Sequence, residues 1–275
     1  MRDRTVFEVE IVAAEVAFEV RVNDLPVLRA PLSRVQTRFD INPYVESGKN
    51  SLSLTVRPRT RGRDFSEHAA CTVTLFQKPN PESEDATSIG TLHFSGYGHD
   101  AVTGFGQSVR PTGGDPIEVE RFGAKATLTC DLETSFPPWS WSEAEKLTPT
   151  EALRAEILAE YHHVHALLAA KDLTGLSARC ALQERDYQYA YYLNSAAEAR
   201  KMLGIEQLVA DQTIEAEPFP NTVLTLELLG NGRLVQLVEP DGKSPLRLRA
   251  TDSPKMVGRF NCVFCKVGGG WQIVR

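Results

Sequence analysis

Apolar and polar residues alternate along several short stretches in the first half of the chain. Residues 6–11 and 16–22 show the pattern most clearly, with charged residues between Val, Phe and Ile. A period of two is typical of a strand with one buried and one solvent-facing side. Turn-forming residues such as Asn42-Pro43 and Gly48-Lys49-Asn50 separate these stretches. The further strands predicted in this half are 35–41, 51–56, 71–76, 89–93 and 117–131. Short strands in this order predict an antiparallel β-sandwich over residues 1–132.

A helical period replaces the strand period after residue 148. Thr148-Pro-Thr-Glu151 matches a capping box with proline at the first helical position. Apolar residues then recur every three or four positions and form one stripe, which predicts a helix lying on a core. The stripe consists of Leu153, Ile157, Tyr161, Val164 and Leu168. A second helix is expected to end near residue 192, and Ser195-Ala-Ala-Glu198 is a capping box that opens a third.

The period returns to that of strands near residue 222. Asn231-Gly232 is a strong signal for a hairpin turn between two of these strands. The predicted strands are 222–229, 233–239, 246–249, 257–267 and 271–274. Three helices followed by antiparallel strands predict an α+β domain over residues 148–275. The stretch 133–147 contains adjacent prolines and two tryptophans, and we predict that it is a linker between the two domains.

Two features of the second half resemble the ketosteroid-isomerase-like (nuclear transport factor 2-like) superfamily. One is the first helix followed by Leu167-Leu-Ala-Ala-Lys-Asp-Leu173, and the other is a final hairpin that ends in Gly-Gly-Trp271-Gln-Ile-Val. The resemblance implies a cone-shaped domain of three helices and an antiparallel sheet, whose interior can bind a ligand. It makes Tyr161 and His165, which lie on the first helix, the candidates for lining a ligand pocket.

Residues 20–56 resemble the jelly-roll modules that are appended to many bacterial enzymes. Val22-Asn23-Asp24 and Gly48-Lys-Asn50-Ser-Leu52 carry this likeness. A carbohydrate-binding module on the first domain is one of the functional alternatives.

The composition of the chain is that of an ordinary soluble protein. Of its 275 residues, 42% are hydrophobic and 24% are charged, and the formal net charge is −6. Proteins that bind nucleic acids usually carry a strong positive footprint, so this charge argues against a nucleic-acid partner. No apolar run approaches the roughly 20 residues of a membrane-spanning helix. The first residues alternate charged with apolar side chains, unlike a secretory signal, so we expect a cytoplasmic protein without a membrane partner.

The sequence offers few groups arranged for catalysis or metal binding. Five cysteines form an odd set, which indicates reduced thiols in a cytoplasmic protein. Cys262 and Cys265 have the spacing of a metal or redox motif, but residues three apart on a strand face opposite sides. His162 and His165 lie one helical turn apart, yet zinc needs further ligands that no other motif supplies. The sequence also lacks a nucleophile elbow and a complete phosphate-binding glycine motif. We therefore predict no catalytic residue, metal or cofactor.

Three other groups of residues are candidates for binding a partner. Four arginines within residues 57–63 suit an acidic surface, although a solvated loop is the simpler interpretation. Tyr97 and Phe105 lie in glycine-rich loops of the sandwich, where binding surfaces are often carried. Four tyrosines within residues 187–192 cannot all face one core, so some are expected at a domain contact or on a binding surface. The predicted partner-binding residues are Arg57, Arg59, Arg61, Arg63, Tyr97, Phe105, Tyr187, Tyr189 and Tyr192.

These observations favour a non-catalytic protein-binding protein. Bacterial immunity proteins, which neutralise a cognate secreted toxin, resemble the chain in being acidic, compact and without catalytic motifs. The resemblance implies that steric and electrostatic contacts occlude the toxin. The alternative from another class is an enzyme or a small-ligand carrier that uses the cone of the second domain. The sequence leaves the oligomeric state open.

Overall fold

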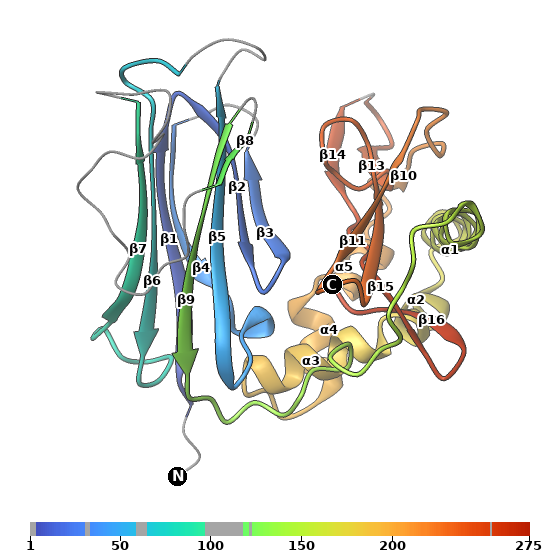
Figure 1. Ribbon diagram of the computed structural model, residues 1–275. Coiled ribbons are helices and arrows are strands. Elements are labelled where there is room, and N and C mark those ends of the chain that lie inside the picture. The colour runs from blue at the N-terminus through green and yellow to red at the C-terminus, as the bar shows by residue number, and fades with distance from the viewer. Residues whose placement is uncertain (1–3, 31–33, 59–64, 97–117, 121–122, 254) are drawn as a thin grey trace. The chain divides into compact units, whose positions relative to one another are not determined.

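The computed structural model describes residues 4–30, 34–58, 65–96, 118–120, 123–253 and 255–275 (Figure 1). The chain forms two compact units, Met1–Phe136 and Pro137–Arg275. The first unit is built mainly from antiparallel strands, and the second from helices and antiparallel strands, as the sequence predicts. No helix in the described ranges is both long and apolar enough to cross a membrane.

Two antiparallel sheets build the first unit. Its strands are β1 (Val6–Ala14), β2 (Val16–Val22), β3 (Leu25–Ala30), β4 (Val35–Asp40), β5 (Gly48–Pro58), β6 (Ala70–Lys78), β7 (Thr87–Ser95), β8 (Glu118–Glu120) and β9 (Gly123–Leu132), with a short 3-10 helix at Asn42–Tyr44. One sheet has the order β4-β1-β6-β7 and the other β3-β2-β5-β9-β8. The two sheets lie face to face, with β2 next to β6 and β7 next to β9 (Figure 1). Alternate residues of β1 and β2 are buried, among them Val9, Ile11 and Val20. The period of two in the sequence is therefore the period of burial.

A pair of asparagines fixes the end of β2 beside the start of β5. The Asn23 side chain donates to the backbone oxygen of Tyr44 (2.8 Å) and to Oδ1 of Asn50 (2.7 Å). Asn50 is buried and donates to the carbonyl oxygens of Glu46 and Gly48. Asn23 has a φ of 50°, a left-handed conformation that asparagine tolerates. Residues 22–24 and 48–52 therefore meet at one hydrogen-bonded corner.

The second unit combines helices with two antiparallel sheets. Its helices are α1 (Glu151–Ala169), α2 (Leu173–Arg179), α3 (Ala181–Ala190), α4 (Ala196–Met202) and α5 (Ile205–Ala210). Its strands are β10 (Ile214–Ala216), β11 (Thr225–Leu229), β12 (Leu234–Val238), β13 (Arg247–Ala250), β14 (Met256–Arg259), β15 (Phe264–Val267) and β16 (Gly270–Ile273). The sheets have the orders β10-β13-β14 and β11-β12-β15-β16. Helix α1 packs against β10 and β12, and its apolar stripe forms the core of the unit with the strands.

The order of helices and then strands is the predicted one, but the elements are divided differently. The predicted second helix is interrupted at Cys180 and becomes α2 and α3. The predicted third helix is α4, and Gly204, with a φ of 71°, separates it from α5. The predicted strand 257–267 is also interrupted, because β14 ends at Arg259 and the chain crosses to the other sheet before β15. The described residues of the second unit thus form five helices rather than three, and its strands are distributed over two sheets.

Helix α1 begins two residues later than a capping box at Thr148 requires. Thr150 caps the helix, because its hydroxyl oxygen accepts a hydrogen bond from the amide of Leu153 at 3.1 Å. Thr150 has an extended backbone (φ −127°), as expected of a residue that precedes the first helical turn. The predicted cap is therefore wrong, whereas the predicted apolar stripe is correct. The buried residues of α1 are Leu153, Ile157, Tyr161, Val164 and Leu168.

Most of the predicted linker packs within the second unit. Trp139 and Trp141 are buried, and the Arg275 guanidinium lies 5.9 Å from the centre of the Trp139 ring. The amide of Leu147 donates to the carbonyl oxygen of Gly232 at 2.8 Å. These contacts fix the segment that leads into α1.

Candidate functional site

Tyr161, the first candidate for a ligand pocket, lies in the packed core of the second unit. Its side chain is fully buried, and its ring meets that of Phe264 edge-on at 5.3 Å. Its hydroxyl donates to the carbonyl oxygen of Cys262 (2.8 Å) and accepts from the amide of Leu237 (3.2 Å). Burial raises the pKa of Tyr161 well above its usual value. The hydroxyl therefore joins α1 to β12 and to the segment before β15, and these contacts occupy it.

His165, the second pocket candidate, also makes a contact within the fold. Its Nε2 lies 2.7 Å from the backbone oxygen of Glu217. His162, one turn earlier on α1, instead lies against the ring of Phe219 at 4.4 Å. Among the described residues, no group of three or more His, Cys, Asp or Glu side chains is placed to hold a metal ion.

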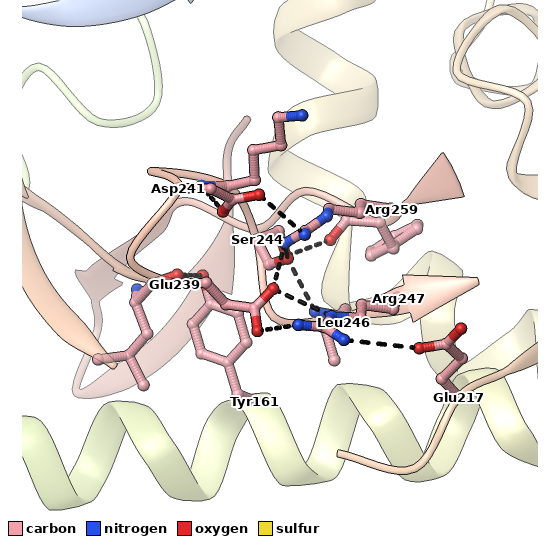
Figure 2. A network of polar contacts seen from close by, with 11 residues as sticks. Tyr161, Glu217, Glu239, Asp241, Ser244, Leu246, Arg247 and Arg259 are labelled. Carbon is pink, nitrogen blue, oxygen red and sulfur yellow. Dashed lines mark hydrogen bonds and ion pairs between the residues drawn. The ribbon is translucent and has the colours of Figure 1, made fainter. Parts of the chain in front are cut away.

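A charged network surrounds Glu239, at the turn between β12 and β13. Its carboxylate is 3% exposed and accepts hydrogen bonds from Arg247 (Nε to Oε2, 3.0 Å) and from Arg259. Arg259 also pairs with Asp241 at 3.0 Å, and Arg247 lies 3.9 Å from Glu217. Figure 2 shows the Glu239 carboxylate between the two guanidinium groups, with Asp241 and Glu217 at the two ends. The hydrogen bond with Glu239 raises the pKa of the Arg247 guanidinium, which keeps it charged.

The Glu239 network connects the two sheets of the second unit. Glu239 follows β12, whereas Arg247 opens β13 and Arg259 ends β14. Arg259 also donates to the backbone oxygen of Ser244 at 2.6 Å, and Ser244 lies in the turn that follows Glu239. Guanidinium groups occupy both oxygens of the Glu239 carboxylate, so this arrangement suits a structural contact between strands better than proton transfer to a substrate. Sequence reasoning missed Glu239, because a glutamate before a Pro-Asp-Gly turn is ordinarily solvated.

Helix α3 carries two further buried carboxylates that sequence reasoning missed. Glu184 accepts hydrogen bonds from Nε and Nη2 of Arg200 at 2.9 and 3.0 Å. Asp186 accepts from the hydroxyl of Ser140 at 2.5 Å and lies 3.4 Å from Nη1 of Arg275. Helical periodicity assigns acidic residues to the solvent side, so the pattern alone gave no signal for either contact.

Four of the five cysteines are buried thiols, and Cys130 is half-buried. All five are free, and both Cys262 and Cys265 lie in the core. Burial raises the pKa of Cys71, Cys180 and Cys265 to about 12, and that of Cys262 well above its usual value. Such a thiol is protonated at neutral pH, and the protonated form is a poor nucleophile and a poor metal ligand.

The tyrosine cluster, which consists of Tyr187, Tyr189, Tyr191 and Tyr192, lies at the C-terminal end of α3 and in the turn that follows. Tyr189 is 46% exposed, whereas the other three are half-buried. The rings of Tyr187 and Tyr191 lie 5.5 Å apart. The cluster thus has one ring directed to solvent and a packed pair beside it.

The other predicted binding residues belong to the first unit. Arg57 is exposed near the end of β5. Arg59, Arg61, Arg63, Tyr97 and Phe105 lie outside the described residues. The arginine segment and the glycine-rich loops therefore remain predictions.

The buried carboxylates and Tyr161 make their contacts within the second unit. Acid–base catalysis needs a titratable group that can reach a substrate, and these groups are paired with guanidinium, hydroxyl or backbone groups instead. Comparison of the chain with protein-family models, with curated proteins and with solved structures found no match.

Proposed function

We propose that this chain is a non-catalytic protein-binding protein that acts as a bacterial immunity protein and occludes a cognate toxin. One observation carries the proposal. The buried side chains that are best suited to chemistry in the second unit, Tyr161, Glu239 and Glu184, all make contacts within the fold. A protein that acts by occlusion needs a stable surface, and such contacts supply the rigidity of that surface.

The exposed tyrosine of α3 is our candidate for the docking face. Tyrosine buries a large area with few rotatable bonds and keeps a polar tip, which is why it is frequent at binding hot spots. Tyr189 is exposed, and the packed rings of Tyr187 and Tyr191 lie on the same short segment. We propose that the Tyr189 side chain is buried in the partner's surface, and that the half-buried tyrosines form the rim of the interface around it.

The charge of the chain fits a partner of opposite sign. The formal net charge is −6, so long-range attraction would accelerate the approach of a basic protein. The proposal places both proteins in the cytoplasm, where five unpaired thiols remain reduced. The relation of the second unit to the ketosteroid-isomerase-like superfamily remains part of the proposal, because it rests on the sequence features alone.

The product of the gene directly upstream is the partner to test, because toxin and immunity genes are expected to be adjacent. We expect the purified proteins to form an equimolar complex in size-exclusion chromatography with light scattering. The variant Tyr189→Ala should weaken binding at least about tenfold, the effect of removing a hot-spot side chain. Val12→Ala is the matched control, since Val12 is 45% exposed and lies in the other unit. Absence of a complex contradicts the proposed partner, and equal binding by Tyr189→Ala contradicts the docking face.

A further inference from the structure

A hollow of about 300 Å³ lies beside α1, apart from the filled interior around Tyr161. Arg154, Leu158 and His162 line one wall, and they succeed one another at intervals of four along α1. The opposite wall is the extended segment between β10 and β11, which includes Phe219 and Asn221. We call this feature the α1 hollow. Its volume lies at the small end of the range for small-molecule sites.

The charge in the α1 hollow is that of the Arg154 guanidinium. No carboxylate is among the residues that line it. The guanidinium of Arg154 donates through Nη2 to the backbone oxygen of Leu224 at 2.6 Å, which fixes its position. Within the part of the chain that the structure describes, Arg154 has no ion-pair partner, so its Nε and Nη1 are available to a ligand. A fixed guanidinium without a counter-ion is a ready site for a carboxylate.

Other polar groups of the hollow are also available. The ring of His162 lies against that of Phe219 in a tilted arrangement, and among the described residues neither of its ring nitrogens has a hydrogen-bond partner. Asn221 and Thr222 are exposed on the facing segment, and their side chains make no hydrogen bond to other described residues. A ligand in the hollow would therefore meet several donors without breaking contacts of the fold.

The walls of the hollow are apolar beside these donors. Leu158 and Phe219 face it from opposite sides, and Leu237 of β12 is also part of the lining. A site with one fixed cation, a few donors and apolar walls suits a ligand with one charged end and an apolar body. We propose that the α1 hollow binds a small organic acid, with its carboxylate on Arg154 and its apolar body between Leu158 and Phe219.

Titration of the full chain with 3-phenylpropanoate, followed by amide NMR, tests this proposal. Saturable binding with a Kd of about 1 mM or tighter is expected for so small a ligand. The shifts should be centred on Phe219, Asn221 and Thr222. The neutral amide 3-phenylpropanamide should bind about tenfold more weakly, because it cannot form the charged pair with Arg154.

Two variants locate the site. Arg154→Gln should weaken binding at least about tenfold, whereas Arg249→Gln, on β13, should not change it. Asn221→Asp places a negative charge on an exposed position at the rim and should weaken binding without disturbing the fold. Asn261→Asp is the control for Asn221→Asp, because Asn261 is exposed and does not line the hollow.

Four results would overturn the proposal. In the titrations, these are absence of saturable binding, equal binding of the amide and the acid, and displacement of the acid by inorganic phosphate at similar concentration. In the variants, the fourth is unchanged binding of the acid by both Arg154→Gln and Asn221→Asp. None of these results depends on a protein partner, so they leave the proposed immunity function to its own test.

Discussion

At the scale of single residues, Glu239 is held by more charged contacts than its position in a turn would indicate. Its carboxylate is buried between Arg247 and Arg259, which reach it from two different strands. Removing one member of a buried ion pair leaves its partner desolvated with less compensation. The stability of the second unit should therefore depend strongly on this carboxylate.

We predict that Glu239→Gln lowers the free energy of unfolding by about 3 kcal/mol, because both guanidinium groups lose their shared counter-ion. Urea denaturation followed by circular dichroism measures this change. Glu215→Gln is the control, since Glu215 pairs with Arg249 at 2.6 Å but both side chains are 40% exposed. That exposed pair should contribute no more than about 0.5 kcal/mol. Equal effects of the two substitutions would refute the structural role of Glu239.

The buried thiols predict how stability changes in alkaline solution. The pKa of Cys71, Cys180 and Cys265 is about 12 in the folded chain, whereas an exposed thiol titrates near 9. A group whose folded pKa is raised stabilises the fold below its unfolded pKa, and this contribution is lost as the pH rises toward the folded value. The free energy of unfolding should therefore fall from about pH 9 upward, by at most about 1.4 kcal/mol per pH unit for each thiol.

Urea denaturation in a reducing buffer at a series of pH values measures this decline. Cys71→Ala should show a shallower decline than the unmodified chain, because one titrating thiol is absent. An identical pH dependence for both proteins would mean that Cys71 is accessible to solvent in the folded chain.

At the scale of elements, periodicity predicts those features that depend on one face of one segment. The stripe of α1 from Leu153 to Leu168 and the alternation of β1 and β2 are correct, because burial repeats with the period of the backbone. The interruption of the strand predicted at 257–267 could not be found in this way. Apolar residues recur along the whole segment. However, the amide of Phe260 donates to the backbone oxygen of Leu246, and the amide of Val263 donates to that of Arg275. Only the tertiary partners show that the chain changes sheets there.

The asparagine corner between β2 and β5 gives a prediction at this scale. Asn50→Ala should lower the free energy of unfolding by about 2 kcal/mol, since it removes a buried side chain together with its hydrogen bonds to backbone groups of Glu46 and Gly48. Asn221→Ala, at an exposed position, should change it by no more than about 0.5 kcal/mol. Thermal and urea denaturation of both variants measure the difference. A loss of similar size in the two variants would show that the corner contributes nothing specific.

At the scale of the whole molecule, the division into a strand unit and a helix-and-strand unit follows from the change of period near residue 148. The candidate sites were harder to predict. Tyr161 is a residue type common in active sites, but only the structure shows that backbone groups occupy its hydroxyl. The sequence did not indicate Arg154 as a binding residue, because a lone arginine on a helix is ordinarily solvated. The hollow that Arg154 lines is completed by the distant segment at Phe219 and Asn221.

We propose that the chain acts by stoichiometric binding to a partner and not by chemical turnover. The most direct measurement is a titration of the toxic activity of the upstream-encoded protein with increasing amounts of this chain. Stoichiometric occlusion predicts that the toxic activity falls linearly with added chain and is lost completely at an equimolar amount. Loss of activity with far less than equimolar chain would indicate turnover, and full activity in excess chain would show that the two proteins do not interact. Either result would contradict the account.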